Sequence, residues 1–246
     1  MTVGSLALFL AAAFVAEVVG TIAGFGAATI LTPIAAIFLD MQTAIAIVTC
    51  FHLSGNVSRL WFFGRHVRWN MALSFGVTGV LCSLIGAMLT THLTSLSIKL
   101  LFGLFLLGYV IIEVMVAGRL TLPQTPATLV TGGAVSGFIA GLLGTGGAIR
   151  SACLFTFGLP KEAYLGTSAL LALLVDGTRL LVYLTGRFLS STMVPVILAL
   201  MVVAWLGAWT GQHLIRRVSA PVFRRLVLGL LALMGVKLLV EGWVSR

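Results

Sequence analysis

The sequence predicts an all-α integral membrane protein made of two inverted repeats of about five helical segments each. Of its 246 residues, 60% are hydrophobic and only 9% are charged, whereas a soluble domain carries about 25% charged residues. A soluble core cannot use so much apolar surface, so lipid must be the main solvent. A glycine-rich stretch also occurs twice, since Gly24–Ala28 (GFGAA) matches Gly144–Ala148 (GTGGA) 120 residues later.

Each half contains five apolar segments, and a spanning helix needs about 20 such residues. The second segment of each half is short and directly follows the glycines, so the first two segments form either two short spans or a re-entrant hairpin. This gives eight to ten transmembrane or re-entrant helices. We expect a first repeat over 1–118, a linker over 119–126 and a second repeat over 127–246. The expected segments are 4–22, 26–39, 42–63, 70–91 and 97–117, then 126–142, 146–158, 163–185, 191–212 and 222–242.

The placement of lysine and arginine predicts the topology. If each glycine-rich break separates two segments, eight basic residues share one side and three lie toward the other. If each broken stretch is one long span, the split is six against five. Because positive charge marks the cytoplasmic side, the first topology is favoured. It makes a multi-pass protein of the cell (inner) membrane, places both termini outside the cytoplasm and inverts one repeat relative to the other. The eight are Arg65, Arg68, Arg119, Lys161, Arg216, Arg217, Arg224 and Arg225, and the three are Lys99, Arg187 and Arg246.

Several classes of function are disfavoured. The net charge of +9 is scattered over short loops, as membrane orientation requires, and does not indicate nucleic-acid binding. The chain lacks HExxH, GxSxG and GxxxxGK[ST] motifs, so it is not expected to be an enzyme or an ATP-driven pump. We expect no catalytic residue, no metal site and no cofactor. The cysteines lack CxxC spacing and are expected to be apolar packing residues.

The glycine breaks are the first candidate site. A helix that begins after such a break exposes unpaired N–H groups and the positive end of its dipole, and both attract anions. Packing between helices through small residues is the alternative. That alternative suits a single cluster, but two clusters at equivalent positions favour a binding site. The backbone donors would come from Gly24, Gly26, Gly144, Gly146 and Gly147.

Three arginines in apolar segments could supply positive charge. Arg150 lies in the first turn after the second break, where its planar fork suits an oxyanion, although it could instead snorkel to the interface. Arg59 and Arg179 occupy equivalent positions. Arg179 has Asp176 three residues before it and is expected to form an ion pair with it. Arg59 has Asn56 rather than a carboxylate at that spacing, so it is the better candidate of the two for binding a ligand. The alternative is that Arg59 only anchors the end of its helix.

Other polar residues could carry protons or line a path. Glu17, His52 and Asp176 are candidates for proton coupling, because ionisable residues in membrane segments are usually functional and histidine titrates near neutral pH. A histidine that only packs between helices is the alternative for His52. Ser151, Thr167 and Ser168 could line the path with hydroxyl groups, although a bond between or within helices is the alternative for each.

Four short stretches carry a resemblance to a known family. They are Gly20–Pro33 (GTIAGFGAATILTP), Gly137–Gly147 (GFIAGLLGTGG), Leu159-Pro160 and Gly166-Thr167-Ser168. With the doubled arrangement, they make the chain resemble the TauE/SafE family of sulfite exporters. The resemblance implies an inverted-repeat transporter of sulfur-containing anions such as sulfite or organosulfonates. The sequence departs from the usual pattern of that family at two places. The first break reads GFGAA, and the second break is followed by Arg150 and Ser151.

We therefore expect a secondary transporter that binds a small anion between the two broken segments and exposes it to each side in turn. The alternative is a permease for metal or other cations on the same fold. The expected partners are a small anionic substrate, the lipid bilayer and coupling protons, with a homodimer left open and no nucleic acid.

Overall fold

Long apolar segments fold as helices in lipid, because lipid offers no partner for free backbone N–H and C=O groups. The computed structural model describes residues 3–23, 26–116, 122–214 and 220–244, and every regular element within these ranges is helical. The α-helices are α1 (Val3–Ala23), α2 (Ala28–Phe38), α3 (Met41–Phe63), α4 (Trp69–His92), α5 (Ser95–Val116), α6 (Pro126–Leu143), α7 (Gly147–Thr156), α8 (Lys161–Thr185), α9 (Val194–Leu214) and α10 (Ala220–Val244). Two 3-10 turns, Gly64–His66 and Ser191–Met193, precede α4 and α9.

The helix ends follow local sequence rules. Asp40 caps α3 by accepting a hydrogen bond from the Thr43 amide at 3.0 Å, and Thr125 caps α6 directly before Pro126, as N-cap preferences predict. Gly144 ends α6 with a left-handed φ of 79°, a conformation that glycine adopts without strain. The predicted segments are confirmed to within a few residues, except that 191–212 begins with the 3-10 turn before α9.

The two halves repeat the same order of elements. Each has a long helix, a short helix and three long helices, and the starts of α2, α3 and their counterparts α7, α8 are about 120 residues apart. Contacts between the halves come in matching pairs: α1 packs along α9 as α4 packs along α6, while α3 packs on its counterpart α8 and α5 on α10. This pattern is expected of two copies related by a two-fold axis. The inversion of one repeat relative to the other, and the division at 118 and 127, stay predictions.

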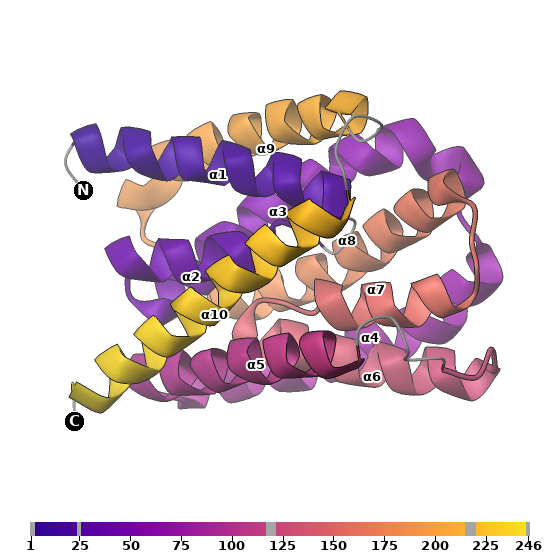
Figure 1. Cartoon of the computed structure of the whole chain (residues 1–246). Helices are drawn as coiled ribbons and strands as arrows, with labels where there is room; N and C mark the ends of the chain where they lie inside the picture. Colours follow the sequence, from indigo (N-terminus) through magenta and orange to yellow (C-terminus); the bar gives the residue numbers. More distant parts are fainter. Residues whose placement is uncertain (1–2, 24–25, 117–121, 215–219, 245–246) are drawn as a thin grey trace.

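The bundle has a central pair of helices. In Figure 1, α3 and α8 lie between α1 and α9 on one side and α4 and α6 on the other, which agrees with the contacts between these helices. In Figure 1, α1 begins and α10 ends at the same end of the bundle. Which side faces the cytoplasm stays a prediction.

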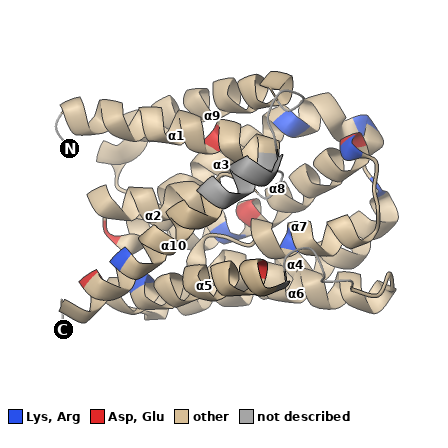
Figure 2. Cartoon of the chain, viewed as in Figure 1, with Lys and Arg blue, Asp and Glu red and all other residues tan. Residues whose placement is uncertain are grey.

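The outer and inner surfaces have opposite polarity. On α4, the exposed side chains Leu73, Val77, Leu81 and Ile85 recur every fourth residue and form one apolar face, as lipid-facing helices do. Figure 2 shows few charged residues along the helices, and these gather at helix ends and in the middle of the bundle. Within the described residues, seven helices are long and apolar enough to cross a membrane. The chain is therefore an all-helical, multi-pass membrane protein.

Helix α3 is an exception that matters for function. It has 23 residues but is not among the seven apolar spans, because polar residues such as His52, Asn56 and Arg59 interrupt it. Short helices α2 and α7 have 11 and 10 residues. At 1.5 Å per residue each reaches about 16 Å, roughly half of the hydrocarbon core.

Five residues used in the predictions lie outside the described ranges. They are Gly24 of the first break and the basic residues Arg119, Arg216, Arg217 and Arg246.

Candidate functional site

The two glycine breaks meet in the middle of the bundle. Gly26 stands before α2 with a left-handed φ of 92°, and Gly146 is the N-cap of α7 without a side-chain cap. The hydroxyl groups of Thr29 on α2 and Thr145 beside α7 are 2.5 Å apart, and the two short helices contact one another. The starts of both short helices, with their unpaired N–H groups, therefore lie close together.

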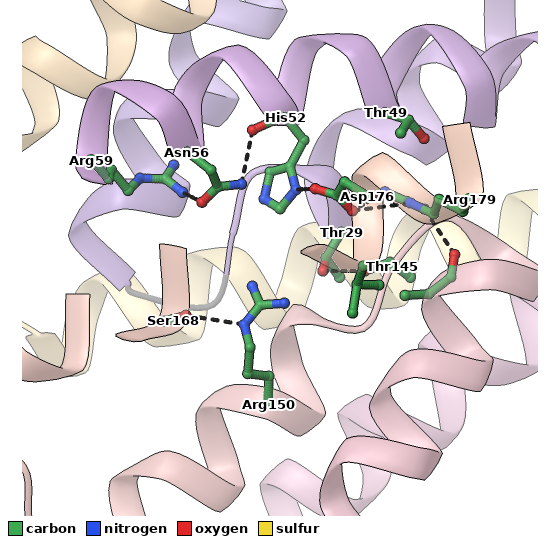
Figure 3. A network of polar contacts seen from close by, with 12 residues as sticks. Thr29, Thr49, His52, Asn56, Arg59, Thr145, Arg150, Ser168, Asp176 and Arg179 are labelled. Carbon is green, nitrogen blue, oxygen red and sulfur yellow. Dashed lines mark hydrogen bonds and ion pairs between the residues drawn. The ribbon is translucent and has the colours of Figure 1, made fainter. Parts of the chain in front are cut away.

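Arg150 rises from the first turn of α7 into this region. Its side chain is buried, with 4% of the residue exposed, and its Nε donates a hydrogen bond to Ser168 Oγ of α8 at 3.0 Å. In Figure 3 the outer end of the guanidinium points away from α7 toward His52. Within the described part of the chain, no carboxylate lies within ion-pair distance of Arg150. Its charge is the least compensated of the buried arginines.

A small polar pocket opens at this guanidinium. The volume of this pocket is about 240 Å³, including the part open to the outside. Pockets for drug-sized ligands are larger, at roughly 300–1,000 Å³. A small ion suits this pocket better. Residues from both repeats line it: Gly20, Thr21, Gly26, Asn56 and Arg59 from the first, and Arg150, Leu165, Ser168 and Ala169 from the second.

Arg59 also lines the pocket, but it has a charged partner that the sequence argument missed. Its Nη2 donates to Glu17 Oε1 on α1, Nη1 donates to Asn56 Oδ1 at 2.8 Å, and Thr21 accepts from Nε and Nη2. The sequence showed only that α3 places no carboxylate three residues before Arg59, and α1 supplies one from outside that helix. Glu17, an acidic residue in an apolar segment without a local partner, was the signal.

The expected ion pair between Asp176 and Arg179 is confirmed. Arg179 donates from Nε and Nη2 to Asp176 Oδ1 at 3.0 and 2.8 Å, and from Nη1 to the Ala140 carbonyl at 2.8 Å. The second oxygen, Asp176 Oδ2, lies 2.7 Å from Nδ1 of His52 on α3. Figure 3 shows this series of polar contacts, which runs from His52 on α3 through Asp176 and Arg179 to the end of α6. Arg179 therefore pairs with Asp176 and is not among the residues that line the pocket.

The other predicted residues divide between the pocket and its supports. Ser168 lines the pocket, whereas Ser151 accepts a hydrogen bond from the Tyr164 hydroxyl at 2.7 Å and Thr167 accepts one from the Arg68 amide at 2.9 Å. Of the described break glycines, Gly26 alone is in the pocket lining. Gly144 and Gly146 instead allow close packing, against Ile45 at 2.9 Å and Ala140 at 2.9 Å from the place a Cβ atom would take. Gly147 is buried at the first position of α7.

Within the part of the chain that the structure describes, one buried positive charge has no carboxylate partner. Among the described residues, three arginines and two acidic residues are buried. Glu17 and Asp176 each pair with one arginine. A buried charge in membrane is costly unless it is compensated, so the remaining guanidinium, that of Arg150, favours a bound anion.

Comparisons with known proteins identify the family of the chain. The family model described as sulfite exporter TauE/SafE matches residues 8–238. The chain is also similar to the sulfite exporter TauE/SafE family protein 3 of Arabidopsis thaliana, with 37% identity over 97 residues. That stretch is 38% of this chain and 19% of the plant protein, so the match spans less than a fifth of that relative. Since the family model covers nearly all of the chain, the chain belongs to the TauE/SafE family of sulfite exporters.

Proposed function

We propose that the protein is a secondary transporter of a small sulfur-containing oxyanion, such as sulfite or an organosulfonate. The single observation that carries the proposal is the buried Arg150 guanidinium, which faces a small polar pocket without a carboxylate partner among the described residues. A guanidinium fork donates parallel hydrogen bonds to two oxygens of one anion. Membership in the family supports sulfur as the central atom.

The position of the pocket supports transport rather than permanent binding. It lies where the two repeats meet, with lining residues from α1 and α3 of one and α7 and α8 of the other. Inverted-repeat transporters bind substrate at such an interface and expose it by rocking one repeat against the other. The short helices α2 and α7 direct their N-terminal ends toward the same region, which adds favourable dipoles for an anion.

The alternative, a permease for metal or other cations, has less support from the described residues. A cation site needs carboxylate or carbonyl oxygens that are free to coordinate. Both oxygens of Asp176 and Oε1 of Glu17 accept hydrogen bonds, which leaves Glu17 Oε2, outside the pocket lining, as the one buried carboxylate oxygen without a partner among the described residues. A cation in the pocket would also face the charges of Arg59 and Arg150.

The test is uptake of labelled sulfite by proteoliposomes that contain wild type or Arg150→Gln. Loss of a charged hydrogen bond donor costs about 1.5–3 kcal/mol, so binding should weaken roughly 10- to 100-fold. Arg65→Gln is the matched control, because Arg65 is exposed in the turn before α4 and its loss removes the same charge. Equal uptake by all three proteins would remove Arg150 from the site. Uptake of cations without uptake of any anion would overturn the proposal.

A further inference from the structure

The imidazole of His52 has one nitrogen engaged and one left open. Only 3% of the residue is exposed. Nδ1 lies 2.7 Å from Asp176 Oδ2, while Nε2 is buried and has no hydrogen-bond partner among the residues that the structure describes. A buried polar atom without a partner is uncommon and requires an explanation.

The partners of Asp176 determine which nitrogen carries the proton. Arg179 donates two N–H groups to Asp176 Oδ1, so the carboxylate is held as an acceptor. Oδ2 then accepts a hydrogen bond from Nδ1–H, and in neutral His52 this leaves the lone pair on Nε2. Asp176 and Arg179 therefore position an imidazole with its basic nitrogen turned away from them.

Gly26, which lines the pocket, leaves room beside that nitrogen because it has no side chain. A Cβ atom on residue 26 would lie 2.8 Å from His52 Nε2 and 3.9 Å from Arg150 Nη2. The two nitrogens therefore approach the same point of the first break, and Gly26 itself lines the pocket. Figure 3 shows the Arg150 guanidinium extending toward the His52 ring.

We propose that His52 Nε2 is a proton-binding site that acts together with Arg150, so that one proton binds with each anion. The inference rests on the proposed function and adds the coupling ion to it. A proton from water binds to the Nε2 lone pair, and the imidazolium keeps its Nδ1–H bond to Asp176. Nε2–H then becomes a charged donor for the anion beside the Arg150 fork.

The surrounding charges make proton and anion depend on one another. Facing His52 are Asp176 and Arg179 of α8, Arg150 of α7, Glu17 of α1 and Arg59 of α3. The carboxylates already pair with arginines, so an imidazolium next to an empty pocket is repelled by Arg150. An anion bound between them removes this repulsion. Such coupling is reciprocal, so the anion promotes protonation as much as the proton promotes anion binding.

The other helices packed against α3 add little charge near His52. α2 carries no titratable side chain, and α9 carries only His213. In α5, Lys99 pairs with Glu241. Of the remaining candidates for proton coupling, Asp176 accepts from both Arg179 and His52. Glu17 also has one oxygen, Oε2, without a hydrogen-bond partner among the described residues, but its other oxygen pairs with Arg59, and His52 is the candidate that approaches Gly26 together with Arg150.

The test uses methanesulfonate, because sulfite itself takes up a proton near neutral pH and would hide the effect. The purified protein in detergent is titrated with methanesulfonate calorimetrically, in two buffers of different ionisation enthalpy and across about pH 5 to pH 8. Wild type should take up about one proton per anion, and its Kd should fall up to tenfold for each unit decrease in pH. His52→Gln should bind without proton uptake and with a flat pH profile. His92→Gln, an exposed histidine at the end of α4, should behave like wild type.

Nitrogen NMR of 15N-histidine protein gives a readout that does not depend on the variant folding well. The His52 signal is assigned by its loss in His52→Gln. It should show a neutral Nδ1–H form without anion and become protonated at Nε2 when methanesulfonate is added. An Nε2 that stays unprotonated with bound anion, or a His52→Gln variant that keeps proton uptake, would overturn the proton site alone. Failure of wild type to bind methanesulfonate, sulfite or sulfate would overturn the proposed function and the coupling with it.

Discussion

At the residue scale, stability and function depend on how buried charges are paired. Glu17 and Arg59 form a fully buried pair between α1 and α3, with side-chain exposures of 0% and 7%. Gly55 of α3 and Gly207 of α9 make room for Glu17, since a Cβ atom at either position would come within 2.8 Å of its side chain. Such a pair is costly to break, because removal of one partner leaves the other charge buried and alone.

We expect Glu17→Gln to lower the free energy of unfolding by about 3–5 kcal/mol, because the buried Arg59 then stays charged without its carboxylate partner. The measurement is thermal unfolding in detergent. The double variant Glu17→Gln with Arg59→Met should be less destabilised than the sum of the two single variants. Glu241→Gln is the control, because Glu241 pairs with Lys99 and Lys237 at a partly exposed position and should cost at most about 1 kcal/mol. Strict additivity of Glu17→Gln and Arg59→Met would contradict the pairing.

The sequence allowed local pairs to be predicted, but not pairs between helices. Asp176 and Arg179 are three residues apart on α8, so helix geometry alone places them together. His52 and Asp176 are 124 residues apart and Arg59 and Glu17 are 42 residues apart. Those pairs depend on which faces of α1, α3 and α8 meet, and periodicity in one segment carries no information on that. Arg150 was identified as a candidate from its place after the glycines.

At the element scale, glycines set how closely helices approach. A Cβ atom on Gly137 of α6 would lie 2.7 Å from backbone carbons of Gly79 on α4, and one on Gly86 of α4 would lie 2.8 Å from the Leu142 amide nitrogen of α6. The two backbones are therefore in direct contact. Small residues that permit such contact are a main source of helix association in membranes.

We expect Gly137→Ala to destabilise the protein by about 1–3 kcal/mol, because a methyl group must separate α6 from α4. Gly108→Ala on α5 is the matched control, since nothing lies within 4 Å of the place its Cβ would take. It should be neutral or stabilising by up to about 1 kcal/mol, because alanine favours the helix over glycine. Thermal unfolding of both variants in detergent measures the difference. Equal melting temperatures would mean that α4 and α6 can separate without loss.

The glycine breaks were also the best sequence guide to the elements. They correctly predicted that a short helix follows each break, as α2 and α7 do. The sequence left open whether these are short spans or returning arms of a hairpin, because length and hydrophobicity fit both. The observed lengths of 11 and 10 residues are too short for a full crossing, as about 20 residues are needed.

At the scale of the whole molecule, the matched contacts of the two halves suggest how transport would work. The pocket takes residues from both repeats, and the central pair α3 and α8 carries most of the buried charges. If the repeats are inverted, motion of one against the other exchanges the two sides for the bound anion. Inversion is thus the property on which the alternating-access proposal depends.

Asn70 and Ser190 offer a direct test of inversion. They are exposed, lie 120 residues apart and occupy equivalent places at the starts of α4 and of the turn before α9. In a background with Cys50, Cys82 and Cys153 replaced by alanine, we expect a membrane-impermeant maleimide to label Ser190→Cys in intact cells. Asn70→Cys should react only after permeabilisation, because Arg65 and Arg68 beside it mark the cytoplasmic side.

The two positions distinguish the possible arrangements without reference to activity. Opposite accessibility with Asn70 outside would keep the inverted repeats and place both termini in the cytoplasm, contrary to the distribution of basic residues. Equal accessibility would mean that the repeats run parallel, because equivalent positions of parallel copies face the same side. Rocking of one repeat against the other could then not exchange the two faces of the pocket, and the anion would need a different route past Arg150.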